Sequence, residues 1–228
     1  MVWLWQNLEL VLGLTLDHAR LSVVPILVSL IVSIPLGWLA SQSRVLRSVL
    51  LSVGSVLFTI PSIALVFVLP PILGTRILDE LNIVIALCVY GVAVMVRGSA
   101  DAFASVSKDV IGSSTAVGYS RWGRFWAVEL PLAGPVLLAS IRVVSVTTVS
   151  LLSVGSIIGV TTLGYLFLDG YQRSFPTEIL IGIGFIVIIA LAFDAALVLL
   201  GRLFLPWTRA MPKSSRASVT RVAAEVTS

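Results

Sequence analysis

Long apolar stretches without charge constrain this chain more than any other feature of its sequence. A helix needs about 20 apolar residues to cross the hydrocarbon core of a bilayer. The stretches that meet or approach this length are residues 21–40, 49–73, 81–96, 132–160 and 179–200. Charged residues make up only 11% of the 228 residues, whereas an average soluble domain carries about 25%. The sequence therefore predicts an all-α integral membrane protein with about five transmembrane helices. It excludes a cytosolic enzyme, a disordered chain and a secreted disulfide scaffold.

Basic residues are unevenly distributed between the two sides of these predicted crossings. Twelve of the fifteen fall on one side: Arg44, Arg47, Arg97, Lys108, Arg121, Arg124, Arg142, Arg202, Arg209, Lys213, Arg216 and Arg221. Because cytoplasmic loops are rich in Lys and Arg, we expect the N-terminus outside and the C-terminus in the cytoplasm. This topology accounts for the net charge of +4 without a nucleic-acid partner.

Three segments follow from this topology. Residues 1–19 contain Trp3 and Trp5, which suit an external segment lying at the membrane interface. Residues 20–207 form the predicted transmembrane domain, with a cytoplasmic loop of about 97–131. Residues 208–228 lack periodicity, and we expect them to form a disordered cytoplasmic tail.

The sequence lacks the patterns of common catalytic and metal-binding sites. Neither lysine follows a glycine-rich loop, so the chain has no phosphate-cradling motif for ATP. His18 is the only histidine, which excludes sites built from several histidines. We therefore expect no catalytic residue, cofactor or metal in this chain. For His18 itself, packing at the start of the first crossing is the simpler interpretation, and a proton relay is the alternative.

Two charges fall inside predicted crossings. Asp194 lies in the fifth and Arg142 near the start of the fourth. An intramembrane carboxylate is a functional candidate, and charges in this environment usually find a partner. The two residues are expected either to pair or to reach the interface separately.

Hydroxyl side chains recur along the second crossing at steps of three and four residues, which places them on one helix face. They are Ser48, Ser52, Ser55, Thr59 and Ser62. Such a face suits a path for a polar solute, although small hydroxyl residues also favour helix contacts in membranes. Pro61 lies near the middle of this crossing and frees a backbone carbonyl there.

The loop between the third and fourth crossings has the pattern of a docking element rather than of a linker. Ser107 or Asp109 suits the start of a short helix, and Gly118 suits its end. Aromatic and basic residues then alternate in a second amphipathic helix, which Pro131 is expected to end before the fourth crossing begins. An interface helix without a partner is the alternative interpretation.

This loop resembles the EAA loop of the permease subunits of bacterial ABC importers. In that family the motif reads EAA, three residues, Gly, nine residues, I-x-L-P. Gly118 matches the glycine, Val128 stands for the Ile, and Leu130 and Pro131 match the Leu-Pro. The EAA positions hold Gly112, Ser113 and Ser114, so the acidic residue is absent and the small size is kept.

Further stretches resemble the osmoprotectant branch of this family, the permeases for glycine betaine, carnitine and choline. Residues 59–65 read TIPSIAL, close to its TIPSLAL, and residues 128–131 read VELP. Arg121 and Trp122 match the end of its TRW. Residues 158–164 read IGVTTLG against IGAGGLG, with Thr161 and Thr162 in place of two glycines.

The resemblance implies a type I ABC importer permease fold in the bacterial inner membrane. It implies as partners two ATPase subunits that bind ATP-Mg, a second permease copy or a sister permease, and an external solute-binding protein. The implied ATPase-coupling residues are Gly112, Ser113, Ser114, Gly118, Arg121, Trp122, Glu129, Leu130 and Pro131. The expected pathway residues are Ser55, Thr59, Pro61 and Ser62 of the hydroxyl face, together with Thr161 and Thr162. The external connection 163–178, with Asp169 and Arg173, is expected to dock the binding protein.

The implied function is the import of a compatible solute such as glycine betaine, carnitine, choline or proline, with ATP hydrolysed by a separate subunit. A permease for amino acids or another small polar solute is the alternative. A stand-alone secondary transporter is a more distant one, since it would carry several intramembrane charges and an inverted repeat.

Overall fold

The computed structural model describes residues 2–76 and 79–209, and within these ranges the chain is helical with no strand. The α-helices are α1 (Val2–Gln6), α2 (Leu8–Gln42), α3 (Arg44–Thr59), α4 (Ser62–Leu73), α5 (Glu80–Ala104), α6 (Lys108–Ala116), α7 (Arg121–Arg124), α8 (Leu130–Leu152), α9 (Tyr165–Gln172) and α10 (Pro176–Phe204). A π-helical turn (Phe125–Glu129) joins α7 to α8, and 3₁₀ turns follow α8 (Ser153–Ile158) and α10 (Pro206–Arg209). Most of the tail predicted to be disordered lies outside the described residues.

The described residues contain four helical segments long and apolar enough to cross a membrane. They are Leu8–Gln42, Glu80–Ala104, Arg121–Ile158 and Pro176–Phe204, which confirms four of the expected crossings. The pair α3 and α4 makes a fifth if it is counted as one span, but it is bent by 98°.

The expectation of one helix over 49–73 is therefore wrong at the bend. Ile60 is extended, with ψ 128°, as a residue before proline prefers to be, and Pro61 has no N–H to continue the helix. The Ile60 carbonyl released by the break accepts a hydrogen bond from the Tyr90 hydroxyl of α5. Helices α3 and α4 thus meet at a sharp bend, which the hydrogen bond from Tyr90 of α5 stabilises.

The expected boundary after residue 19 is also absent, because α2 continues from Leu8 to Gln42 without a break. Val11 and Leu14 are buried in a cluster with Val149, Leu163 and Ile189, so this part of the chain packs on the bundle. At 1.5 Å per residue, the 35 residues of α2 span about 50 Å, more than the roughly 30 Å of a hydrocarbon core.

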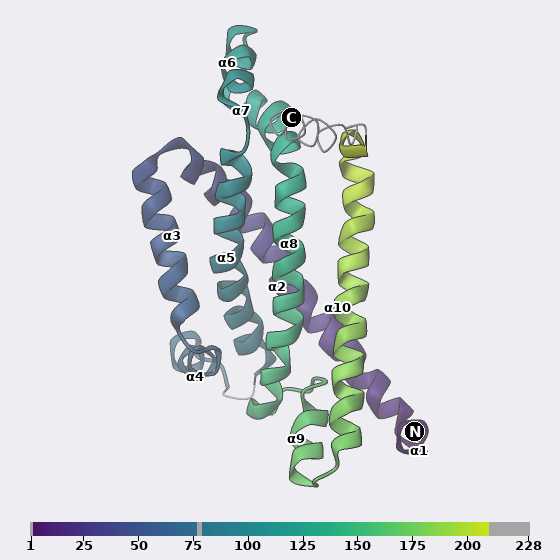
Figure 1. The fold of residues 1–228 in the computed structure, drawn as a ribbon. Coiled ribbons are helices and arrows are strands. Elements are labelled where there is room, and N and C mark those ends of the chain that lie inside the picture. The colour runs from purple at the N-terminus through teal and green to yellow at the C-terminus, as the bar shows by residue number, and fades with distance from the viewer. Residues whose placement is uncertain (1, 77–78, 210–228) are drawn as a thin grey trace, which may run out of the picture.

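Helices α2, α5 and α8 form the centre of the bundle, with α3 on one side and α10 on the other (Figure 1). Small residues permit the close approach. A Cβ on Gly37 of α2 would lie 2.3 Å from the Cβ of Ser99 in α5, and one on Gly91 would lie 1.9 Å from the hydroxyl of Ser29. Such small-residue contacts replace the hydrophobic driving force that is missing between helices in lipid.

The two ends of the bundle differ. Helices α6 and α7 extend beyond α5 and α8 at the end where α10 finishes, whereas α1, α4 and α9 lie at the opposite end (Figure 1). The predicted loop 97–131 therefore includes the last turns of α5 and a projecting helical hairpin.

Candidate coupling loop and transport path

Helix α6 is short, polar and exposed. The Ser107 side chain caps it by accepting a hydrogen bond from the Asp109 N–H at 3.3 Å, and Gly118 ends the turn after it with φ +101°. This start and this stop confirm the sequence prediction, since a left-handed φ favours glycine. No residue of α6 is buried. Gly112, Ser113 and Ser114 all lie on this helix, and a Cβ on Gly112 would meet no atom within 4 Å.

The second predicted helix of the loop does not end at Pro131. Helix α7, the π-helical turn and α8 form one continuous helical segment, in which the Leu130 N–H donates to the Phe125 carbonyl five residues back. Pro131 sits in the first turn of α8, where its missing N–H costs least because the π-helical turn has already shifted the hydrogen-bond register. The loop is therefore joined to its membrane helix without a flexible connection.

Glu129 is the centre of a hydrogen-bond network at the base of the loop. Glu129 as a whole is 2% exposed. One carboxylate oxygen accepts from the Trp38 indole N–H of α2 at 2.8 Å, and the other accepts from Nε of Arg124 at 2.7 Å. Arg124 also donates through Nη1 to the Thr115 hydroxyl of α6 at 2.7 Å. A buried carboxylate paired in this way is rigidly placed, because loss of either donor leaves charge unsatisfied.

Aromatic rings surround this network. The Trp38 ring lies 5.1 Å from Phe125 and 5.7 Å from Trp122, measured between ring centroids. The guanidinium of Arg121 stands 5.0 Å from the centre of the Trp38 ring, within the range of a cation–π contact. Leu130 packs against the same apolar cluster. The resemblance pointed to Arg121, Trp122 and Glu129, but it missed Trp38, whose partner lies 91 residues away.

The hydroxyl face predicted on the second crossing is exposed. Ser48, Ser52, Ser55 and Thr59 of α3 are exposed, and Ser62 is half-buried beyond the bend. The buried position of α3 is Gly54, where an added Cβ would lie 3.1 Å from the Ala93 carbonyl of α5. Within this chain, therefore, the hydroxyls of α3 are not buried between helices.

Arg97 of α5 adds a positive charge to this face that the sequence reasoning did not assign to a path. Its Nη2 donates to the Ser55 hydroxyl at 3.3 Å, and the Arg97 side chain is exposed. The acid one turn further along α5, Asp101, forms an ion pair with Arg47. Among the described residues Arg97 has no acidic partner.

Thr161 and Thr162 follow Gly159, which has φ +82°, at the end of the molecule away from α6. Thr162 is fully buried and its hydroxyl accepts from the Gly164 N–H at 3.2 Å, so this residue does not line an open path here. Thr161 is exposed and borders a depression of about 480 Å³ with Glu9 and Asp17 of α2.

The intramembrane charges Arg142 and Asp194 pair with each other. Nε and Nη2 of Arg142 donate to the two Asp194 oxygens at 2.6 and 2.8 Å. This bidentate contact joins α8 to α10. Of the two arrangements expected from the sequence, pairing and separate contact with the interface, the structure has the pair. Bidentate geometry fixes both partners in orientation, which favours a structural role.

His18 is fully buried with both ring nitrogens engaged by backbone. Nδ1 accepts from the Leu163 N–H at 3.3 Å, and Nε2 lies 2.9 Å from the Val149 carbonyl. Because Nδ1 accepts, the ring is neutral with its proton on Nε2. The packing interpretation therefore fits better than the proton relay.

An acidic cluster surrounds Arg173 between α9 and α10. Arg173 pairs with Asp169 and, at 2.5 Å, with the fully buried Glu178. Partial burial lowers the pKa of Arg173, but the charges of Glu178 and Asp169 outweigh it and raise that pKa above its usual value. Tyr171 beside this cluster is 79% exposed. The surface expected to dock a binding protein therefore presents the exposed ring of Tyr171, whereas the charge of Arg173 is already paired with Asp169 and Glu178.

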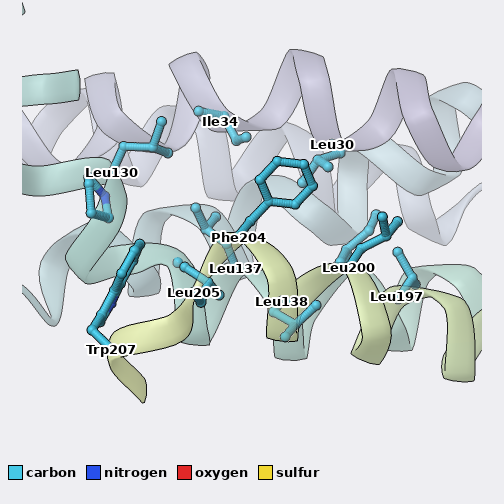
Figure 2. Close-up of a pocket in the computed structure, with 14 residues that line it drawn as sticks. Leu30, Ile34, Leu130, Leu137, Leu138, Leu197, Leu200, Phe204, Leu205 and Trp207 are labelled. Carbon is cyan, nitrogen blue, oxygen red and sulfur yellow. The ribbon is translucent and has the colours of Figure 1, made fainter. Parts of the chain in front are cut away.

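A large groove lies between α2, α8 and α10, and Figure 2 shows the residues that line it. It includes the end of α10, which lies at the end of the bundle that carries α6 (Figure 1). Its volume is about 420 Å³. Its walls are entirely Gly, Pro, Leu, Ile, Phe and Trp, including Leu30, Leu137, Leu200, Phe204 and Trp207. A groove without polar partners does not suit a polar solute, so this space is not the candidate path.

The comparisons with known proteins agree with the loop motif. The family model described as "Binding-protein-dependent transport system inner membrane component" matches residues 33–210. The carnitine transport permease protein OpuCB of Listeria monocytogenes is 30% identical, over 80% of this chain and 83% of that protein. The osmoprotectant import permease protein OsmW of Salmonella typhimurium is 27% identical, over 84% of this chain and 90% of that protein. The choline transport system permease protein OpuBB of Bacillus subtilis is 26% identical, over 84% of this chain and 87% of that protein.

A solved structure shares the fold. The MetNI methionine ABC transporter in an inward-facing conformation superimposes with a TM-score of 0.75 at 20% identity, over 87% of this chain and 98% of that chain. The predicted type I importer permease architecture is therefore confirmed. With a family model covering most of its length, the chain belongs to the binding-protein-dependent transport system inner membrane components, a family of multi-pass membrane proteins.

Proposed function

We propose that this chain is the permease subunit of an ATP-driven importer for a compatible solute of the glycine betaine, carnitine and choline class. The observation that carries the proposal is the exposed helix α6, held at one end of the bundle by the Glu129 network. The curated relatives named above, whose names refer to osmoprotectant, carnitine and choline transport, support the substrate class.

Helix α6 is the proposed contact with an ATPase subunit that binds ATP-Mg. Its outer surface carries Gly112 and Ser113, which are small, and Val117 after it is 80% exposed. Small residues beside an exposed apolar side chain allow close docking of a partner surface. ATP-driven movement of that partner would move α6 and, through the continuous segment Arg121–Ile158, the membrane helices, as in a rigid-body switch.

The proposed path follows the exposed face of α3. Ser55, Thr59 and Arg97 offer polar groups on a membrane-spanning surface. A charge in such a segment normally faces a water-filled space or a protein partner rather than lipid. A second permease copy or a sister permease facing α3 would enclose this space, and an external binding protein would deliver the solute at the end that carries α9.

The test is purification of the chain, expressed with its native neighbours, in mild detergent. We expect an ATPase subunit to copurify, and its ATP hydrolysis in proteoliposomes to rise when a solute-loaded binding protein is added. We expect uptake of radiolabelled glycine betaine, carnitine or choline only when ATP is present. Solute uptake without any ATPase subunit would contradict the proposal.

A further inference from the structure

Helix α6 is attached to the rest of the chain by few contacts. None of its residues is buried, and half-buried Ile111 alone of its residues packs against the apolar cluster at the base of the loop. The polar link between α6 and that base is the hydrogen bond from Arg124 to the Thr115 hydroxyl. The orientation of α6 therefore depends strongly on where Arg124 is held.

Arg124 is in turn held by Glu129. The Nε–Oε1 distance is 2.7 Å, and the two side chains are 15% and 3% exposed. Hydrogen bonds between charged groups are about twice as strong as neutral ones, and burial keeps water from replacing them. Glu129 thus sets the position of Arg124 and, one step further, of α6.

The second oxygen of Glu129 is bound to the first long helix of the bundle. The indole N–H of Trp38 donates to it at 2.8 Å, and Trp38 is 6% exposed. Helices α6 and α2 are far apart in sequence, yet one carboxylate joins them through three hydrogen bonds: Arg124 donates to Thr115 and to Glu129, and Trp38 donates to Glu129.

We propose that Glu129 and Trp38 are positioning residues that transmit displacement of α6 to α2. The inference rests on the proposed docking of α6 to an ATPase. Helix α2 also packs on α5 and α8 through apolar contacts, but the continuous segment Arg121–Ile158 contains no part of α2. The Trp38–Glu129 hydrogen bond gives α2 a directional polar contact with that segment at the end beside α6. With this contact, α2 and α8 respond together.

The test compares W38F and W126F in the complete reconstituted complex. W38F keeps an aromatic ring and removes the N–H donor. W126F is the matched control, because Trp126 is 63% exposed beside the same ring cluster and its indole donates no described hydrogen bond. The measured quantity is the number of solute molecules imported per ATP hydrolysed, together with the ATPase rate and the subunit stoichiometry.

We expect W38F to lower import per ATP by about tenfold while the ATPase rate and assembly stay within about twofold of wild type. E129Q should lower the same ratio, and the double variant W38F/E129Q should fall little further than E129Q alone, because contacts in one network are not additive. W126F should behave as wild type.

An unchanged ratio in W38F overturns the inference. So does a parallel loss of ATPase activity and import, or a loss of assembly, since either would make the contact structural only. Failure of the wild-type complex to bind an ATPase is a different result, because it removes the proposed function itself.

Discussion

At the scale of single residues, the membrane part of the protein is held by a few polar contacts in apolar surroundings. The Arg142–Asp194 pair joins α8 to α10, and His18 joins α2 to both α8 and the turn at Leu163. Neither contact needs to change its protonation to do this. The role of each contact is therefore best tested by measuring the stability of variants.

The ion pair gives the first such test. D194N should lower the Tm of the purified protein on the order of 5 °C, because it leaves the Arg142 guanidinium without its counter-charge. R142M/D194M removes both charges and should recover part of that loss. The measurement is thermal unfolding in detergent, and solute uptake at a temperature where both variants are folded is the control. Wild-type Tm in D194N, or a full loss of uptake by the folded R142M/D194M, would assign the pair another role.

His18 gives the second test. H18A leaves the Leu163 N–H and the Val149 carbonyl without partners in a buried site, and each unsatisfied group costs about 1–3 kcal/mol. We expect the free energy of unfolding to fall by about 2–4 kcal/mol, measured by denaturant titration in detergent, and H18Q to restore some of it. A proton relay makes the opposite prediction: H18A would keep its stability and lose uptake.

At the scale of elements, the exposed face of α3 carries the sharpest prediction about the solute. Glycine betaine and carnitine have a carboxylate and choline does not. If Arg97 faces the path, R97Q should lower uptake of the two carboxylate solutes by about tenfold and change choline uptake by less than about twofold. R44Q is the matched control, since Arg44 is an exposed cation at the start of α3 with no ion pair among the described residues. Equal losses for all three solutes would remove Arg97 from solute recognition.

The sequence predicts elements of this protein better than their connections. Apolar runs locate the crossings because the bilayer sets their length, and Ser107 and Gly118 locate α6 because caps are local. Hydropathy carries no information about direction, so the 98° bend before α4 is hidden inside one apolar run. The hydrogen bond between Trp38 and Glu129 depends on how two helices that are distant in sequence pack together. Residue spacing in the sequence therefore does not predict it.

At the scale of the whole molecule, the polar features separate by end. The bundle places α6 and the Glu129 network at one end and the Arg173 cluster at the other (Figure 1). The apolar groove of Figure 2 lies on the side of α2, α8 and α10, whereas the hydroxyl face lies on α3. In the proposed assembly the apolar groove of α2, α8 and α10 faces lipid, and the hydroxyl face of α3 faces the other permease subunit.

Helix α2 runs without a break through this whole arrangement. His18 anchors it near one end and Trp38 near the other, and the residues between them span about 30 Å. Helix α2 is thus held near both of its ends by buried hydrogen bonds. In the proposed importer, a tilt of α2 imposed at the end beside α6 would therefore reach the opposite end directly, where the binding protein is proposed to deliver the solute.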